Sequence, residues 1–337
     1  MASPPHQIRR RKIIDDEDRG EVRQRTVAEM GEFAVIDRAT RGRVQTADSI
    51  LGPGDDAAVV AAPDGRVVVT TDMLVQGRHF RLDWSSPVDI GRKAIAQNGA
   101  DIAAMGARCT GFLVALGCPA DTSLSVTDGV TEGLWREATR AGAGIVGGDL
   151  VQSDSLVISI TALGDLGGRS PILRSGAKPG NVVAVAGRLG WSAGGLAVLL
   201  AGSAHHRSLV EFHRAPQPDY LQGISAAVNG ATSLTDVSDG LIADLGHIAQ
   251  ASSVAIDLHS ESIRLDEEIV DAAHDLGSSA LDWALNGGED HSFVGTFAAD
   301  ASLPDGWIRI GWVREGAGVT VDGRKFSGGN GWSSFST

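Results

Sequence analysis

The sequence predicts a mixed α/β protein of the α+β kind, divided into two domains. Its 337 residues exceed the usual size of a single core, and at roughly 150 residues per domain they suggest two. Helical and strand patterns occur in both halves, without the strict strand–helix–strand alternation of a parallel sheet. A cluster of Gly, Pro and Ser at 167–180 predicts a linker. We therefore expect a leader at 1–28 and domains at 29–167 and 168–337.

Elements of the N-terminal half follow from apolar patterns and the residues that bound them. Strands are expected at 56–61 and 66–71, joined as a hairpin by the turn residues at 63–65. An apolar stripe predicts a helix at 88–105, ended by Gly106. The other expected elements are a partly helical stretch at 26–33, a strand at 110–116, a helix at 123–140 and strands at 144–151 and 156–163.

The C-terminal half shows the same mixture. A helix opened by Asp239 is expected to run to about residue 251, because an aspartate before an apolar periodic run is a common helix cap. The other expected elements are strands at 182–186, 254–258, 292–297, 307–312 and 318–321 and helical stretches at 193–200 and 208–229. No short-period repeat is visible.

Composition and charge exclude several functional classes. The chain has 42% hydrophobic and 21% charged residues, no apolar run of the ~18 residues needed to span a membrane, and no secretory signal. A net charge of -13 with few lysines disfavours nucleic-acid and membrane partners. Cys109 and Cys118 fit no metal or redox spacing and predict buried thiols in a reducing compartment. We expect a cytoplasmic protein.

Acidic side chains stand beside Gly, Ser or Thr at the ends of six apolar runs. A single aspartate in such a place is more often a turn former or a helix cap, and Asp239 is the best example. A whole set of acids without nearby lysines would repel itself unless cations bound it, and hard oxygen ligands predict Mg²⁺. The six segments are Gly54-Asp55-Asp56, Thr70-Thr71-Asp72, Asn98-Gly99-Ala100-Asp101, Gly147-Gly148-Asp149, Asp236-Val237-Ser238-Asp239 and Gly287-Gly288-Glu289-Asp290.

A site rich in carboxylates and glycine, in a chain poor in lysine, indicates a nucleotide held through metal, with ATP as the candidate. The usual nucleotide motifs are absent, since the sequence has no P-loop and no His-Arg-Asp or Asp-Phe-Gly element. Gly142, Gly144 and Gly147 spell Gly-x-Gly-x-x-Gly, but they follow an expected helix and lead into an expected strand. That order is the reverse of a dinucleotide-binding turn, so we reject the motif.

The ordered set of these segments resembles the thiamine-monophosphate kinase family, within the superfamily of aminoimidazole-ribonucleotide synthetase and selenophosphate synthetase. The resemblance spans about residues 31–335. It implies an aminoimidazole-ribonucleotide synthetase-like fold, with an N-terminal mixed sheet whose strands pair across a homodimer, a C-terminal α+β domain and an active site between them. It is carried by Gly54 to Ala57, Thr71 to Val75, His79-Phe80, Asp101 to Gly106, Gly147 to Asp149, Arg174 to Gly180, Asp236 to Leu245 and Gly287 to Asp290.

The resemblance also implies roles for individual residues. The Mg²⁺ positions are Asp56, Thr70, Thr71, Asp72, Asp101, Asp149, Asp236 and Asp239. ATP-contacting positions are Gly148, Asp149, Arg174 and Ser238, and Asp72, Asp149 and Arg174 would surround the transferring phosphoryl group. Substrate positions are His79, Glu289 and Trp332, with Phe335 as the alternative to Trp332. Plainer interpretations stay open: a packed His79, an Arg174 that only caps or forms a salt bridge, and a Trp332 that belongs to a satellite core.

The reaction that the resemblance implies is direct in-line transfer of the ATP γ-phosphoryl group to thiamine monophosphate, assisted by several Mg²⁺ ions and without a phosphoenzyme. An aminoimidazole-ribonucleotide synthetase-type ligase is the alternative enzyme. A catalytically silent Mg-nucleotide sensor is the alternative from another class. The thiol chemistries of the superfamily's selenium and hydrogenase-maturation members are disfavoured, because both cysteines lie in mid-chain and the sequence ends in Ser336-Thr337.

Overall fold

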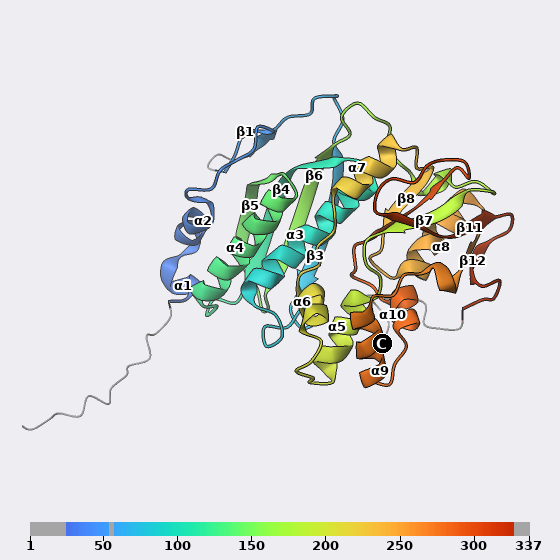
Figure 1. Ribbon diagram of the computed structural model, residues 1–337. Helices are drawn as coiled ribbons and strands as arrows, with labels where there is room; N and C mark the ends of the chain where they lie inside the picture. Colours follow the sequence, from blue (N-terminus) through green and yellow to red (C-terminus); the bar gives the residue numbers. More distant parts are fainter. Residues whose placement is uncertain (1–24, 54–56, 327–337) are drawn as a thin grey trace, which may run out of the picture.

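The computed structural model describes residues 25–53 and 57–326. It is a mixed α/β structure with two separate main sheets, one in each half of the chain (Figure 1). A four-stranded sheet has the order β3-β6-β4-β5, and a six-stranded sheet has the order β12-β9-β11-β7-β10-β8. A short β1-β2 pair precedes them. The strands are β1 (Ser49–Leu51), β2 (Val59–Val60), β3 (Val68–Val75), β4 (Arg108–Cys118), β5 (Gly144–Gln152), β6 (Val157–Asp165), β7 (Val182–Ala186), β8 (Ser233–Asp236), β9 (Ala255–Leu258), β10 (Phe293–Phe297), β11 (Trp307–Arg314) and β12 (Gly318–Val321).

Helices cover the four-stranded sheet on one face and the six-stranded sheet on both. The α-helices are α1 (Val27–Met30), α2 (Glu32–Thr40), α3 (Pro87–Ala104), α4 (Leu124–Arg140), α5 (Trp191–Leu200), α6 (Arg207–Arg214), α7 (Leu221–Val228), α8 (Leu241–Ser252), α9 (Glu267–Asp275) and α10 (Ala280–Asn286). Two short 3-10 helices, η1 (Arg174–Gly176) and η2 (Ser260–Ser262), lie in connections. The part of the chain that the structure describes has no helix long and apolar enough to cross a membrane.

The helix α3 confirms the expected boundaries to within a residue. Ser86 caps it and exchanges hydrogen bonds with Asp89 in a capping box, and Gly106, with φ of 75°, follows its end. Ile90 and Ile95 on its inner face are fully buried. The first turns of α3 and the neighbouring helix α4 pack on the four-stranded sheet. They form the helical layer that covers one face of this sheet.

The last turns of α3 pack on the other sheet. Ala100 and Ala103 join a core cluster with α7 and with Phe293 of β10, while α8 covers the opposite face of the six-stranded sheet. The backbones of α3 and α7 approach so closely that a Cβ on Gly223 would lie 1.9 Å from the Ala103 carbonyl oxygen. The helix α3 is therefore shared by both halves, and residues on it lie between the two sheets.

The predicted hairpin between residues 56–61 and 66–71 is wrong. The strand β2 pairs with β1, and β3 pairs along its whole length with β6. The turn itself exists, because the Asp64 carboxylate accepts hydrogen bonds from the Arg66 N–H and guanidinium. The same turn is tied to the end of β6, since Gly168 N–H donates to Asp64 and Arg66 donates to the Arg169 carbonyl. These bonds direct β3 onto β6 instead of back along β2.

Three further expectations differ from the structure. The helical stretch at 208–229 is two helices, α6 and α7, separated by a segment that contains two prolines, Pro216 and Pro218. Asp239 does not cap α8: Gly240 holds the cap position, and Asp244 accepts the free N–H groups of the preceding loop instead. The helices α2, α9 and α10 and the strand β1 were not expected. The domain boundary at 167/168 stays a prediction.

Candidate active site

Three carboxylates from three elements meet beside α3. Asp72 lies on β3, Asp101 in the last turns of α3, and Asp236 at the end of β8. Their closeness is evident from their mutual electrostatic influence, because Asp72 and Asp236 both raise the pKa of Asp101. Burial contributes most to that increase, which brings the pKa of Asp101 to about 8. One carboxylate from each sheet and one from α3 therefore lie close together.

Hydrogen bonds hold Asp101 and the backbone of Asp72 in place. The Thr70 hydroxyl donates to Asp101 at 2.9 Å, and the Asp72 N–H donates to the Asn98 side-chain oxygen at 2.9 Å. The loss of hydration and the charge of Asp236 raise the pKa of Asp72, against the lowering effect of His291. These contacts orient the acids but leave their charge uncompensated, which is the condition for holding a cation.

His291 is the counter-charge that the structure supplies. Its Nδ1 lies 3.0 Å from an Asp236 oxygen, and both residues are buried. Burial lowers the pKa of His291, but the bond to Asp236 and the surrounding negative charge outweigh burial and raise it overall. Within the described ranges, His291 is the only residue in an ion pair with Asp72, Asp101 or Asp236. One imidazolium does not offset the negative charge of three neighbouring carboxylates, and the raised pKa of Asp101 reflects this imbalance. The carboxylate oxygens are ligands suited to Mg²⁺.

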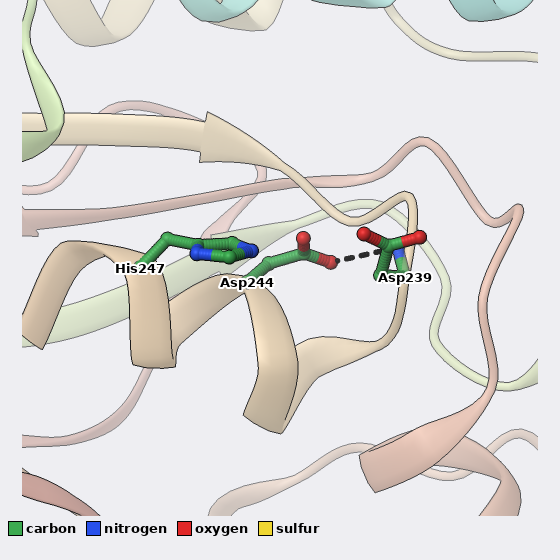
Figure 2. A group of neighbouring side chains, drawn as sticks. All are labelled: Asp239, Asp244 and His247. Atoms are coloured by element: carbon green, nitrogen blue, oxygen red, sulfur yellow. Dashed lines mark hydrogen bonds between the residues drawn. The ribbon is translucent and has the colours of Figure 1, made fainter. Parts of the chain in front are cut away.

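A second acidic group lies at the start of α8 (Figure 2). One oxygen of Asp244 accepts the N–H groups of Ser238, Asp239 and Gly240, each at 3.0 Å. Figure 2 shows the bond from Asp239. Ligand atoms of Asp239, Asp244 and His247 lie within 4.8 Å of one another. Burial and the charges of Asp236 and Asp239 raise the pKa of Asp244 to about 7. Asp244 therefore fixes the loop that carries Ser238 and Asp239 next to the first cluster.

Arg174 faces the same loop from η1. Its guanidinium lies 3.4 Å from the Thr235 hydroxyl on β8, and its charge lowers the pKa of Asp239, although burial raises that pKa overall. The Ser238 carbonyl accepts the Glu289 N–H at 2.8 Å, which joins this loop to the segment at 287–291. The residues assigned to ATP in the C-terminal half are therefore neighbours.

His79 and Glu289 lie around Lys93, in the first half of α3. The Glu289 carboxylate is 2.8 Å from the Lys93 ammonium and 3.6 Å from His213 Nδ1. Burial would raise the pKa of Glu289, but Lys93 and His213 lower it to about 2. The Val75 N–H donates to His79 Nδ1, and burial lowers the pKa of that imidazole, so His79 is neutral and carries its proton on Nε2.

The structure does not bring Asp149 to this cluster. The strand register places Gly148 opposite Val114, Val114 opposite Ile160 and Ile160 opposite Asp72. Asp149 is thus three strand spacings, about 14 Å, from β3. It also lies on the other face of the sheet, because neighbours along a strand alternate between faces. On that uncovered face Thr71 donates its hydroxyl hydrogen to the Ile160 carbonyl.

Sequence reasoning missed Lys93, Asp244 and His291. His291 directly follows the Gly287–Asp290 segment, and Asp244 lies within the Asp236–Leu245 segment, so their positions beside recognised acids were the available signal. Lys93, next to Arg92, lies in a helix that is otherwise largely apolar, and a lysine in such a helix is a signal of a buried ion pair. Two predicted positions, Asp56 and Trp332, together with Phe335, lie outside the described residues.

Comparisons with known proteins identify a family and a shared fold. Residues 54–166 match the family of the AIR synthase related protein, N-terminal domain. A thiamine-monophosphate kinase of Mycobacterium tuberculosis is 54% identical over 312 residues, covering 92% of this chain and 93% of that protein. The crystal structure of thiamine-monophosphate kinase from Stenotrophomonas maltophilia K279a has 32% identity and a TM-score of 0.74, covering 87% of this chain and 95% of that one.

A third relative is a solved structure of AaThiL complexed with AMPPCP and TMP. It shares 32% identity with this chain at a TM-score of 0.76, over 91% of this chain and 98% of that chain. The likeness therefore extends over both sheets. The chain belongs to the thiamine-monophosphate kinase family.

Proposed function

We propose that this protein transfers the γ-phosphoryl group of ATP to thiamine monophosphate, giving ADP and thiamine diphosphate. The observation that carries the proposal is the meeting of Asp72, Asp101 and Asp236, from two sheets and a shared helix, in a chain 54% identical to a thiamine-monophosphate kinase. The relative solved with AMPPCP and TMP supports the same pair of substrates.

The acceptor needs no general base. A phosphate monoester has its second pKa near ~6, so its attacking oxygen is mostly deprotonated at neutral pH. That oxygen forms a bond to the γ-phosphorus, while the bond to the β–γ bridging oxygen breaks and its electron pair leaves with ADP. His79, held neutral by the Val75 N–H, is then free to donate a hydrogen bond from Nε2 and to position the acceptor. We assign no phosphoenzyme.

The donor groups fit Mg²⁺. Mg²⁺ bound there would neutralise charge on the phosphate oxygens. Arg174 and Ser238, with Gly148, would contact ATP. Within the described residues, we propose as metal ligands Thr70, Thr71, Asp72, Asp101, Asp149, Asp236 and Asp239, and we place Asp72, Asp149 and Arg174 around the transferring group.

The test of this function is a comparison of acceptors. With ATP and Mg²⁺, the purified protein should convert thiamine monophosphate and leave thiamine unreacted, because a free alcohol must lose its proton to attack, whereas a phosphate monoester already carries the charge. His79→Ala and Glu289→Ala should mainly raise the KM for the acceptor, while the KM for ATP stays near its wild-type value. The rate of ADP release, measured with each acceptor in a coupled enzyme assay, shows which acceptor the protein uses.

Equal rates with thiamine and its monophosphate would contradict the acceptor assignment. ATP binding without ADP production would instead favour the nucleotide sensor, and turnover only with an aminoimidazole precursor would favour the ligase. Weakened ATP binding in Glu289→Ala, as large as the loss for the acceptor, would refute our division of the site.

We infer that the protein works as a homodimer through the uncovered face of the four-stranded sheet. Val69, Met73 and Val151 on that face are 62%, 53% and 52% exposed, an apolar surface that a second copy would cover. Asp149 lies on the same face, on the edge strand opposite to β3. The dimer would therefore place Asp149 in the interface, and we propose that it serves the site of the partner.

Light scattering should give twice the chain mass of 34.9 kDa at micromolar concentration. Val69→Glu should shift the protein toward the monomer, because it places a charge in the apolar contact. Leu200→Glu is the matched control, since Leu200 is 68% exposed on α5, in the other half of the chain. A monomeric wild-type mass, or equal dissociation in both variants, would contradict this interface.

The proposed setting is the cytoplasm. Cys109 and Cys118 are both free and buried, as expected in a reducing compartment. We also keep the boundary at 167/168 as a proposal for two domains, supported by the placement of one sheet before it and one after it.

A further inference from the structure

The most deeply buried cation beside the site is Lys93, which sequence reasoning did not assign. Its residue is 2% exposed, in the middle of α3. The ammonium lies 2.8 Å from Glu289 Oε1, 3.3 Å from the His79 carbonyl oxygen and 3.5 Å from the His213 carbonyl oxygen. An ammonium has three protons to donate, and these three acceptors match that number.

The three acceptors come from different parts of the chain. His79 follows β3 in the N-terminal half, His213 ends α6, and Glu289 lies in the loop before β10. Two of them, His79 and Glu289, are the residues assigned to the acceptor. Lys93 is also eight residues before Asp101, about 12 Å along the helix axis, so it sits at the acceptor end of the site and not at the metal end.

The Glu289 carboxylate has a buried side and an open side. Its side chain is 35% exposed although Lys93 behind it is 3% exposed. Oε1 is held by Lys93, whereas Oε2 is 3.6 Å from His213 Nδ1, beyond hydrogen-bond distance. His213 is not a competing cation, because burial lowers its pKa to about 4 and its Nδ1 lies 2.9 Å from the Ser192 hydroxyl. At neutral pH, Lys93 is therefore the cation that pairs with Glu289.

The backbone of Glu289 also needs support. Its φ of 63° is in the left-handed region, which is unfavourable for a glutamate, and its N–H is tied to the Ser238 carbonyl at 2.8 Å. The ion pair with Lys93 of α3 fixes the direction of the Glu289 side chain. With Oε1 held, only Oε2 remains for a ligand, in a single direction.

We propose that Lys93 is a positioning residue for the acceptor: it orients Glu289 and the His79 segment so that Oε2 of Glu289 meets a cationic or N–H-bearing heteroaromatic ring. Lys93 itself lies behind the carboxylate and does not touch the substrate. This inference rests on the proposed function, because it takes Glu289 as an acceptor residue.

The experiment is a double-mutant cycle on acceptor binding, with Lys93→Met, Glu289→Gln and the double variant. Methionine keeps the length and apolar stem of lysine but removes the charge. Lys93→Met should raise the Kd and KM for thiamine monophosphate by about tenfold or more and leave the Kd for an ATP analogue within about twofold. In the Glu289→Gln background the same substitution should add little, because its effect passes through Glu289.

Tyr220→Phe is the matched control. The Tyr220 hydroxyl, just before α7, donates to Glu137 of α4 at 2.8 Å, so it too is a partly buried tie between the halves, away from the acceptor. Its loss should lower Tm without changing the acceptor Kd. Should Lys93→Met fail to fold, Lys93→Gln replaces it in the cycle, because the amide can still donate to a carbonyl.

Three results would overturn the positioning role of Lys93 and leave the proposed function standing, provided that the wild type turns over thiamine monophosphate. The first is an equal loss of affinity for the acceptor and the ATP analogue in Lys93→Met. The others are a lower Tm without a change in acceptor Kd, as in Tyr220→Phe, and additive effects in the cycle. A wild-type protein that does not convert thiamine monophosphate would contradict the proposed function and, with it, this role.

Discussion

Asp101→Asn should reduce turnover by roughly a hundredfold to a thousandfold or more, and yet leave the Mg²⁺-free protein as stable as the wild type or more stable. Asparagine keeps the shape and can still accept the hydrogen bond from Thr70, but it removes one negative charge from the group that includes Asp72 and Asp236. Without metal, the folded wild type must bind a proton at Asp101 to avoid repulsion from its neighbours, a cost that asparagine does not carry, while the capacity to hold metal is lost.

The pH dependence of stability gives an independent readout. The pKa of Asp101 is about 8 in the folded protein, against about 3.9 when unfolded, so the folded state holds a proton that the unfolded state releases between these values. Without Mg²⁺, this group makes the wild type less stable as pH rises from about 4 to 8, and Asp101→Asn should remove that part of the slope. Thermal melts over this range, with and without Mg²⁺, test it.

A matched control is Asp165→Asn. Asp165 is also buried, but it pairs with Arg108 at 3.1 Å, at the far end of β6. Loss of that pair should lower Tm and leave turnover per folded molecule nearly unchanged, the reverse of the pattern for Asp101. Near-normal turnover of Asp101→Asn at saturating Mg²⁺ would show that Asp101 only stabilises its surroundings.

Local signals in the sequence predicted individual elements well. The apolar stripe of α3 and the glycine that follows it, Gly106, are local features, so its boundaries could be predicted to within a residue. The hairpin failed because the turn at Asp64 indicates a reversal of the chain but not the strand that accepts it. That choice depends on contacts a hundred residues away, which no local pattern contains.

The candidate site divides in the same way. Asp72, Asp101 and Asp236 could be predicted because each ends or follows an apolar run, and the structure places them together. Lys93 could not, because a buried lysine is meaningful only through its partner Glu289, nearly two hundred residues further along. Side-chain chemistry was thus predictable from types and spacing, whereas pairing between the halves was not.

The separation of Asp149 from the other acids leads to the last expected result. In a mixture of two inactive homodimers, Asp72→Asn and Asp149→Asn, exchange of subunits should restore about a quarter of wild-type activity. Half of the dimers are then mixed, and in each mixed dimer one site receives both wild-type aspartates. The physical reason is the distance: Mg²⁺ holds its ligands at about 2.1 Å, and residues about 14 Å apart on opposite faces of one sheet cannot share an ion.

The control mixture joins Asp72→Asn with Asp101→Asn. These two residues act in one cluster of one subunit, so every site of the mixed dimer contains one substitution, and activity should stay near the level of the single variants. Two affinity tags allow the mixed dimer to be purified and its formation checked by mass. A purified mixed dimer of Asp72→Asn and Asp149→Asn that stays inactive would mean that Asp149 acts within its own subunit, at a place separate from the cluster. Recovery of activity in that dimer but not in the control would assign Asp149 to the site of its partner. It would also give a function to an acid that lies on the face where we place the dimer contact.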